Sequence, residues 1–353
     1  MGLTVASVGY PLAMVSSQTA GGAEQVLSIL DESLVREGHR SVVLAPRGSS
    51  CRGLLIPAEV PAGVLDEAAK REARRSFKKL LDRTLEACPV DLVHMHGLDF
   101  DAYLPGVEVP VVVTLHLPVS WYAAGALGRV GPNVNLVSVS ESQARTAACE
   151  IPIRRVIPNG IDLGRFHPME KKSNYALAIS RLCPEKGIHL AIDAAERAGI
   201  DLIVAGRLFE YPEHRAYFDA MVRPRLNRRI RFIGRVGGRG KAALLAGARC
   251  LLIPSLAPET SSLTAMEAMA SGTPVVAFRT GALPEIVSSG DTGFLVNDVE
   301  EMAEAIRRAD GIDSRLCRSE AERRFSSASM FAAYLELYRA VTGGEPVQEP
   351  EAA

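Results

Sequence analysis

The sequence predicts an α/β protein built from two doubly wound domains, each with a parallel sheet between layers of helices. Short apolar, β-branched segments alternate with longer segments of helical periodicity, and this rhythm runs twice along the chain. The strand segments are apolar throughout, which is typical of parallel sheets buried on both faces. The length of 353 residues fits two domains of about 150 residues each.

The first half of the chain supplies one set of elements. Its expected strands are residues 3–8, 41–45, 91–95, 109–115 and 136–139. Helical periodicity connects them, most clearly over residues 23–36 and 65–87. Strands that alternate with helices in this way form βαβ units and pair in parallel. We therefore place a first domain over residues 1–160.

The second half restarts the same rhythm after a segment rich in Pro, Gly and charge at residues 157–172. Its expected strands are residues 175–179, 202–205, 230–233, 250–253 and 274–278. We place the second domain over residues 170–325 and a last amphipathic helix over residues 328–341. The Gly-, Pro- and Glu-rich tail, residues 342–353, is expected to be disordered.

Composition excludes several classes of function. The 40 basic and 41 acidic side chains give a net charge of -1, so no nucleic-acid partner is expected. The six cysteines occur singly, as is usual in a reducing cytoplasm. The first 20 residues hold no Lys or Arg, and no apolar run reaches about 18 residues. The expected location is the cytoplasm, with peripheral contact at the inner face of the membrane as an option.

A pair of glycines opens the first expected helix. Gly21 and Gly22 follow the first strand segment, where backbone amides at a helix N-terminus can receive an anion. The pattern is not GxGxxG, so it does not support a nicotinamide dinucleotide site. A plain tight turn explains the two glycines equally well.

Two cations follow the first strand of the second half. Arg181 and Lys186 lie five residues apart at the end of that strand and can converge on one diphosphate. Arginine offers a planar fork of donors and lysine a point charge. Spacing alone slightly favours the alternative, two solvated surface cations.

Two carboxylates eight residues apart form the most informative pattern. On one continuous helix, Glu259 and Glu267 would be about 12 Å apart along the axis, enough to reach both ends of an extended ligand. Carboxylates accept hydrogen bonds from sugar hydroxyls, and the amides from Ser261 through Ser262 to Leu263 could receive phosphate. The alternative is a first-turn glutamate followed by a solvated one. The small apolar residues after Glu267 favour a packed cleft.

The motifs and their order along the chain resemble those of the retaining glycosyltransferase family four, which has the GT-B fold. The resemblance covers nearly all of residues 3–338, and its most specific part is the segment from Glu259 to Glu267. It implies two Rossmann-like domains facing a cleft, with the C-terminal helix returning to the N-terminal domain. The matching segments are Gly21-Gly22, His94-Met95-His96, Thr114-Leu115-His116, Pro158-Asn159-Gly160, Arg181 to Gly187, Glu259 to Glu267, and Gly281 to Val287.

The resemblance implies a role for each matching residue of the second half. Arg181 and Lys186 fall where the family binds the donor diphosphate. Glu259 falls where it holds hydroxyls of the transferred sugar, and Glu267 where it holds the ribose hydroxyls.

Other matching residues fall around the same ligand. His116 falls at the first-domain histidine near the sugar, and Gly21 and Gly22 at the loop that closes on phosphate and acceptor. Arg235 and Val236 fall near the donor base.

One segment departs from the family. The family usually has Phe-Gly after the first glutamate, and this chain has Ser261 and Ser262. Two hydroxyls are added and the backbone freedom of a glycine is lost, so the identity of the donor sugar stays open.

The expected activity is retaining, metal-independent transfer of a hexosyl group from a nucleoside diphosphate sugar to a hydroxyl acceptor. A UDP- or GDP-sugar is the expected donor, the acceptor is unknown, and no cofactor is expected. The alternatives are a GT-B-fold nucleotide-sugar epimerase, a sugar phosphorylase, or a nucleotide-sugar-binding protein without turnover.

Two other features have a plain and a functional interpretation. His94 and His96 share one face of a strand end, but a metal site there lacks a third ligand at suitable spacing. Residues 66–83 form a basic amphipathic helix. Packing on the sheet is the favoured interpretation, and weak contact with anionic lipid is the alternative.

Overall fold

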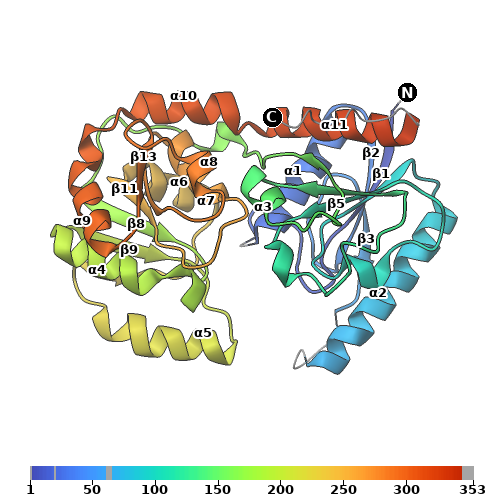
Figure 1. Ribbon diagram of the computed structural model, residues 1–353, viewed down its shortest axis with the longest axis horizontal. Coiled ribbons are helices and arrows are strands. Elements are labelled where there is room, and N and C mark those ends of the chain that lie inside the picture. The colour runs from blue at the N-terminus through green and yellow to red at the C-terminus, as the bar shows by residue number, and fades with distance from the viewer. Residues whose placement is uncertain (1, 20, 61–65, 344–353) are drawn as a thin grey trace. The chain divides into compact units, whose positions relative to one another are not determined.

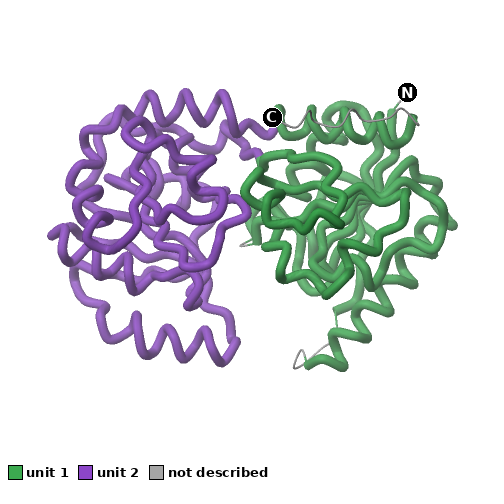
Figure 2. The backbone as a smooth tube through the Cα atoms, viewed as in Figure 1, with its two compact units in different colours: residues 1–159, 328–353 green, residues 160–327 purple. Residues whose placement is uncertain are grey.

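The computed structural model describes residues 2–19, 21–60 and 66–343, which fold into two compact units. The first unit takes its residues from 1–159 and from the chain after residue 327. The second unit is residues 160–327 (Figure 2).

The first unit is built on a parallel sheet in the strand order β3-β2-β1-β4-β5-β6-β7. Its strands are β1 (Thr4–Val8), β2 (Arg40–Pro46), β3 (Leu54–Ala58), β4 (Leu92–Met95), β5 (Val111–Leu115), β6 (Val134–Ser138) and β7 (Ile153–Val156). In the register of the sheet, Val5 of β1 lies between Ser41 of β2 and Leu92 of β4. The order reverses direction between β1 and β4, and ligands of such sheets bind outside the carboxyl ends of the strands at that point.

The second unit repeats the plan with the order β10-β9-β8-β11-β12-β13, again with every neighbouring pair parallel. Its strands are β8 (Tyr175–Ile179), β9 (Asp201–Ala205), β10 (Ile230–Phe232), β11 (Cys250–Ile253), β12 (Val275–Phe278) and β13 (Gly293–Val296). Here the order reverses between β8 and β11. The two doubly wound sheets confirm the predicted fold class.

Three strands of the structure were not expected from the sequence, and all three lie at the edge of a sheet. β3 contains Pro57, which cannot donate a ladder hydrogen bond and is tolerated at an edge. β7 is four residues long and carries two arginines, and β13 begins at Gly293. β7 lacks the continuous apolar run that marks a central strand, and the apolar runs of β3 and β13 are short and include a proline or a glycine.

Helices cover both faces of the first sheet (Figure 1). α2 (Glu67–Ala87) buries Phe77 and Leu81 in a cluster with the strands. α1 (Gly22–Arg36) buries Leu27 against Val43 of β2 in a second cluster. The Asp66 side chain accepts a hydrogen bond from the Ala69 amide at 2.8 Å, so α2 begins at residue 67.

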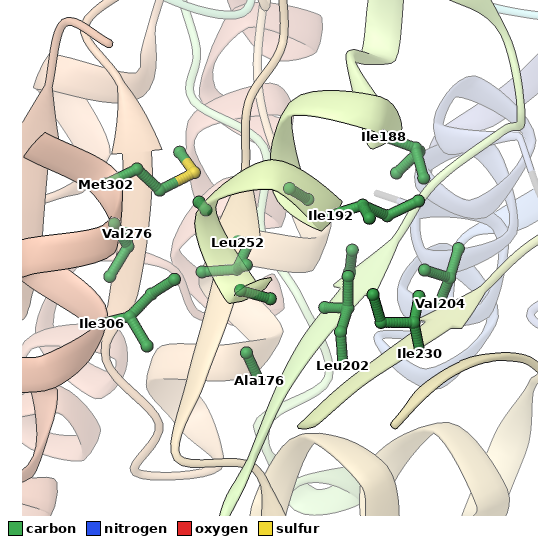
Figure 3. Close-up of a cluster of buried hydrophobic side chains, with 14 of the residues drawn as sticks. Ala176, Ile188, Ile192, Leu202, Val204, Ile230, Leu252, Val276, Met302 and Ile306 are labelled. Atoms are coloured by element: carbon green, nitrogen blue, oxygen red, sulfur yellow. The ribbon is translucent and has the colours of Figure 1, made fainter. Parts of the chain in front are cut away.

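The second sheet is covered in the same way. On one face, α4 (Ile188–Ala198) and α9 (Val299–Arg308) pack their apolar stripes onto β8, β9, β11 and β12 (Figure 3). The other face is covered by α7 (Leu263–Ala270) and α10 (Ser314–Arg324). Burying one aliphatic side chain of this kind stabilises the fold by about 1.5–3 kcal/mol. The fully or almost fully buried side chains on the first face include those of Ile188, Ile192, Leu202, Val276, Met302 and Ile306.

The C-terminal helix α11 (Ser327–Gly343) belongs to the first unit from Ala328 onward (Figure 2). Tyr334 and Tyr338 are completely buried there. The helix extends beyond the expected end at residue 341, so the first two residues of the expected tail are helical. Residues 344–353 of that tail lie outside the described residues.

Candidate functional site

The predicted site residues of the second unit gather at its strand-order reversal. Arg181 and Lys186 lie in the loop that follows β8, and Glu259 lies in the loop that follows β11. β8 and β11 are hydrogen-bonded neighbours, with Leu177 opposite Leu251. Both loops therefore leave the sheet at adjacent carboxyl ends, where the fold places ligands.

A glycine brings these two loops into contact. Gly187 has a φ of 61°, and a Cβ at this position would overlap the Pro254 carbonyl oxygen. The Glu185 carbonyl also accepts a hydrogen bond from the Leu256 amide at 2.8 Å. Only glycine permits both the left-handed backbone and this close approach at little cost.

Lys186 and Glu259 are directly paired. The Lys186 Nζ lies 2.6 Å from the Glu259 Oε1, and the two side chains are 22% and 13% exposed. The Ser255 hydroxyl donates a hydrogen bond to the same oxygen. Arg181 is half-buried and forms no salt bridge within the part of the chain that the structure describes. This pairing was not expected, because the family resemblance assigned the lysine and the glutamate to separate parts of the ligand.

The backbone of Glu259 is fixed from the other side by the loop after β12. Gly281 has a φ of 55°, and a Cβ there would overlap the backbone of Glu259. The Ala282 amide donates to the Glu259 carbonyl at 2.7 Å. The carboxylate is thus presented from a backbone held by two neighbouring loops.

Glu267 lies apart from this pair, within α7. Since α7 begins at Leu263, the two glutamates do not share one helix, and the helical spacing considered above does not apply. Glu267 is buried and forms a salt bridge with Lys241 of α6 (Gly238–Gly247), whose side chain is 15% exposed. Lys241 was not among the site residues expected from the sequence.

Ser261 and Ser262, which precede α7, make different contacts. The Ser262 hydroxyl caps the helix and accepts from the Ala265 amide at 3.4 Å. The Ser261 hydroxyl oxygen is buried and has no hydrogen-bond partner among the described residues. A buried hydroxyl of this kind costs about 1–3 kcal/mol unless water or a ligand satisfies it. Ser261, rather than Ser262, is therefore free to contact a ligand.

Arg235 and Val236 lie further along the sheet. They follow β10, which β9 separates from β8. Arg235 is exposed and Val236 is half-buried. Their place beside the donor base remains an expectation from the family resemblance.

In the first unit, Gly21 is the N-cap of α1 and Gly22 is the first residue of that helix. Gly21 has an extended backbone, with φ -86° and ψ 133°, so its glycine is not required by a left-handed conformation. A Cβ on Gly21 would instead overlap the Glu24 carboxylate. This helix start therefore already holds an acidic group close to its amides.

His116 follows β5, and its Nε2 lies 2.9 Å from the Nδ1 of His96, which follows β4. Burial lowers the pKa of His116 to about 3. Burial, together with the neighbouring His94 and His116, lowers the pKa of His96 well below its usual range. Both rings are therefore neutral at pH 7, and one shares its ring proton with the other.

His94 is a structural residue. Its Nδ1 lies 2.7 Å from the Tyr338 hydroxyl of α11, and its Nε2 lies 2.7 Å from the Thr114 hydroxyl. The Thr114 hydroxyl in turn lies 2.8 Å from the Tyr334 hydroxyl. Because both ring nitrogens are used, His94 cannot bind a metal without losing these contacts. The His94–His96 metal alternative is therefore disfavoured.

The basic helix α2 neutralises much of its own charge. Within it, Lys70 pairs with Glu67 at 2.7 Å and Lys78 with Asp82 at 2.7 Å. Arg74 also pairs with Asp99 at 2.6 Å, outside the helix. These contacts, with the buried apolar stripe of α2, agree with packing on the sheet. No helix in the described ranges has both the length and the apolar character that a membrane crossing needs.

The chain is similar to known glycosyltransferases in both sequence and fold. The family description "Glycosyltransferase Family 4" matches residues 20–165, and "Glycosyl transferases group 1" matches residues 173–309. A glycogen synthase of Mycobacterium tuberculosis is 30% identical over 301 residues, which are 74% of this chain and 71% of that protein. A phosphatidyl-myo-inositol mannosyltransferase of Mycobacterium leprae is 25% identical over 94% of this chain and 97% of that protein. The crystal structure of Anabaena Alr3699/HepE with UDP-glucose has a TM-score of 0.73 and 19% identity, covering 96% of this chain and all of that one.

Proposed function

The chain belongs to glycosyltransferase family 4 and has its GT-B fold, and we propose that it catalyses retaining, metal-independent hexosyl transfer. The donor is a nucleoside diphosphate sugar and the acceptor is a hydroxyl group. The observation that carries the proposal is the cluster of Arg181, Lys186 and Glu259 at the junction of β8 and β11.

The two cations fit a diphosphate. Lys186 is 22% exposed in the side chain, and Arg181 is half-buried without a salt bridge among the described residues. The buried Ser261 hydroxyl at the start of α7 adds a donor without a partner in the described structure. Donors fixed in a partly desolvated site stabilise developing negative charge without reorganising during the reaction. This is the charge that a nucleoside diphosphate acquires as it leaves.

Glu259 can act at both the phosphate end and the sugar end of the ligand. Its Oε1 accepts from Lys186 and Ser255. The second carboxylate oxygen can accept hydrogen bonds from sugar hydroxyls. The same contact also aligns Lys186, because a lysine held by a carboxylate has few rotamers left. Glu259 thus positions the sugar and preorganises the cation.

In the proposed reaction, the bond between the anomeric carbon and the donor phosphate oxygen breaks, and the acceptor oxygen forms a bond to that carbon on the same face. The acceptor proton passes to the departing phosphate oxygen. No enzyme-bound sugar is formed, so the carboxylates of Glu259 and Glu267 remain salt-bridged to lysines. His116 of the first unit is neutral, and its role near the sugar stays a prediction from the family resemblance.

The names of two relatives support transfer of a hexose. One relative is a glycogen synthase and another a phosphatidyl-myo-inositol mannosyltransferase. The HepE structure was solved with UDP-glucose. From these three proteins we propose that the donor of this chain is a UDP- or GDP-hexose.

The test begins with thermal unfolding in the presence of UDP-, GDP-, ADP- and TDP-hexoses. A ligand at 100 times its dissociation constant stabilises the folded state by about 2.7 kcal/mol. The donor that stabilises is then incubated with candidate hydroxyl acceptors, and free nucleoside diphosphate is measured. Acceptor-dependent release of the diphosphate, with one glycoside formed per diphosphate, is the expected result.

Other outcomes identify the alternatives. Conversion of the donor into a stereoisomeric sugar without an acceptor would indicate an epimerase. Release that requires inorganic phosphate would indicate a phosphorylase. Binding without turnover across a broad acceptor panel would indicate a nucleotide-sugar-binding protein.

A further inference from the structure

A second cluster of chemically reactive side chains lies beside the Lys186–Glu259 pair. Cys183, Glu185 and His214 each place one ligand atom within 4.8 Å of the other two. Among the described residues, this is the one group of three His, Cys, Asp or Glu side chains so arranged. Two members come from the loop after β8 and the third from α5 (Pro212–Tyr217).

The three residues differ in exposure in a useful way. Cys183 is buried, His214 is half-buried and Glu185 is exposed. The cluster therefore has a buried thiol at one end and an opening to solvent at the carboxylate. An ion can enter from the Glu185 side without unfolding the loop.

One ring nitrogen of His214 lacks a hydrogen-bond partner in the part of the chain that the structure describes. Its Nδ1 is buried and makes no hydrogen bond within the described residues. The ring is oriented by edge-on contacts with Tyr211, at a centroid distance of 5.1 Å, and with Phe209, at 6.4 Å. An imidazole that is held by aromatic neighbours and lacks a partner for a buried nitrogen is suited to bind a ligand there.

The chemistry of the three side chains indicates which metal ion they would bind. A thiolate, an imidazole and a carboxylate together suit Zn²⁺, whereas Mg²⁺ and Ca²⁺ prefer oxygen alone. Zinc–ligand bonds of about 2.0–2.3 Å require the ligand atoms to lie roughly 3.3–3.8 Å apart. The present spacing, within 4.8 Å for the three ligand atoms, therefore contracts by at most about 1.5 Å on binding.

We propose that Cys183, Glu185 and His214 bind one Zn²⁺ ion, with water in the fourth position. On binding, the Cys183 thiol releases its proton to solvent and the sulfur coordinates as the thiolate. The ion joins the loop after β8 to α5 and fixes the backbone between Arg181 and Lys186. It contacts neither cation, so it acts on the order of this loop and not on bond breaking.

The backbone around the site is already prepared for such a role. The Glu185 carbonyl is anchored by the Leu256 amide, and the Lys186 amide donates to the Cys183 carbonyl at 3.1 Å. One residue, Pro184, separates Cys183 from Glu185 on this constrained turn, so both side chains can reach the same point. Metal binding requires no new fold of the loop.

The test uses the full chain without a histidine tag, first treated with chelator and then titrated with Co²⁺ and Zn²⁺. Co²⁺ bound to a thiolate gives a sulfur-to-metal absorption band in the near ultraviolet, and calorimetry gives the stoichiometry for Zn²⁺. We expect one equivalent of each metal and the thiolate band. Cys183→Ser and His214→Ala should each remove the band and weaken Zn²⁺ binding at least about tenfold.

The controls are an exposed cysteine and an exposed histidine of the same chain, Cys149 and His167. Cys149→Ser and His167→Ala should bind metal as the unmodified protein does. Thermal unfolding without metal shows whether every variant is folded, and added Zn²⁺ should raise the Tm of the controls but not of Cys183→Ser. The proposal would be overturned if Cys183→Ser and His214→Ala bound Zn²⁺ as tightly as the unmodified chain does. It would also be overturned if the unmodified chain bound no Zn²⁺. These readouts do not depend on transferase activity, so a failure of the zinc proposal can be distinguished from a failure of the proposed function.

Discussion

At the scale of single residues, the salt bridge between Lys186 and Glu259 joins two functions that the sequence suggested were separate. The lysine was expected to bind phosphate and the glutamate sugar hydroxyls, but the Nζ and Oε1 atoms lie 2.6 Å apart. The sequence could identify both residue types and their order. It could not show the pairing, because 73 residues separate them in the chain and the contact depends on the close approach of two loops.

Lys186→Ala should weaken the binding of donor and of free nucleoside diphosphate together, because both carry the same anion. A lost hydrogen bond between charged groups costs about 1.5–3 kcal/mol, roughly 10- to 150-fold in affinity. Glu259→Gln should leave diphosphate affinity unchanged or tighter, since it removes a competing anion from Lys186, while turnover falls. Calorimetry and steady-state rates measure the two effects, with exposed Lys171→Ala as the control. Unchanged diphosphate affinity in Lys186→Ala would remove this lysine from the site.

The family resemblance places Glu267 at the ribose end of the ligand, and we propose that role here. Glu267→Gln should therefore weaken the binding of nucleoside, monophosphate and diphosphate by the same factor, whereas Lys186→Ala should affect mainly the diphosphate. The exposed Glu304→Gln serves as the control. Tm measurements separate this effect from the loss of the buried Lys241 salt bridge. A diphosphate-specific loss in Glu267→Gln would contradict the assignment.

At the scale of elements, the sequence predicted the central strands and the long helices α1, α2 and α11 but missed β3, β7 and β13. A central strand needs a continuous apolar run because both of its faces and both of its edges are covered. An edge strand pairs on one side only and tolerates Pro57 or a run with two arginines. Local sequence therefore carries less information about edge strands than about the middle of a sheet.

The loop after β8 depends on Gly187 for its position. Gly187→Ala should destabilise the protein and weaken diphosphate binding, because the new Cβ would press the loop away from Pro254. Gly199→Ala is a matched control, since its φ of 70° is similar but no atom lies within 4 Å of the added Cβ. The control should show only the cost of a left-handed alanine, about 1–2 kcal/mol. Urea unfolding and calorimetry measure both properties, and equal losses in the two variants would show that the loop contact is unimportant.

The buried histidines of the first unit should make its stability depend on pH. Burial lowers the pKa of His94 and of His116 from 6.5 to about 3. The unfolded chain therefore takes up protons first, and the free energy of unfolding should fall as pH decreases from about 6.5 toward 3. Each such histidine contributes up to about 1.4 kcal/mol per pH unit in that window.

The comparison of urea midpoints at pH 7 and pH 5 measures this effect. His116→Gln should reduce the difference between the two midpoints, because one titrating group is removed. His167→Gln, at an exposed position, should leave the difference unchanged. A His116→Gln variant with the full pH dependence would show that His116 is protonated in the folded protein.

At the scale of the whole molecule, the order of the motifs in the sequence carried more information than any motif alone. Separately, the paired glycines, the two cations and the two glutamates each had a plain alternative. In the fold, Arg181, Lys186 and Glu259 lie at the β8–β11 junction, which is where a doubly wound sheet places its ligand. The pairing of Lys241 with Glu267 and the cluster at Cys183 could not be predicted, because each joins segments that are distant in the chain.

The central claim is retaining transfer with fixed cations in place of a metal at the diphosphate. Its most direct measurement is NMR of the anomeric proton of the product, formed at saturating α-linked donor in the presence of a chelator of divalent ions. We expect an α-linked product, formed at a rate that added magnesium or manganese does not raise, since on our proposal Arg181 and Lys186 neutralise the leaving diphosphate. A β-linked product would contradict retention. Loss of activity that magnesium or manganese restores would contradict the role of the cations.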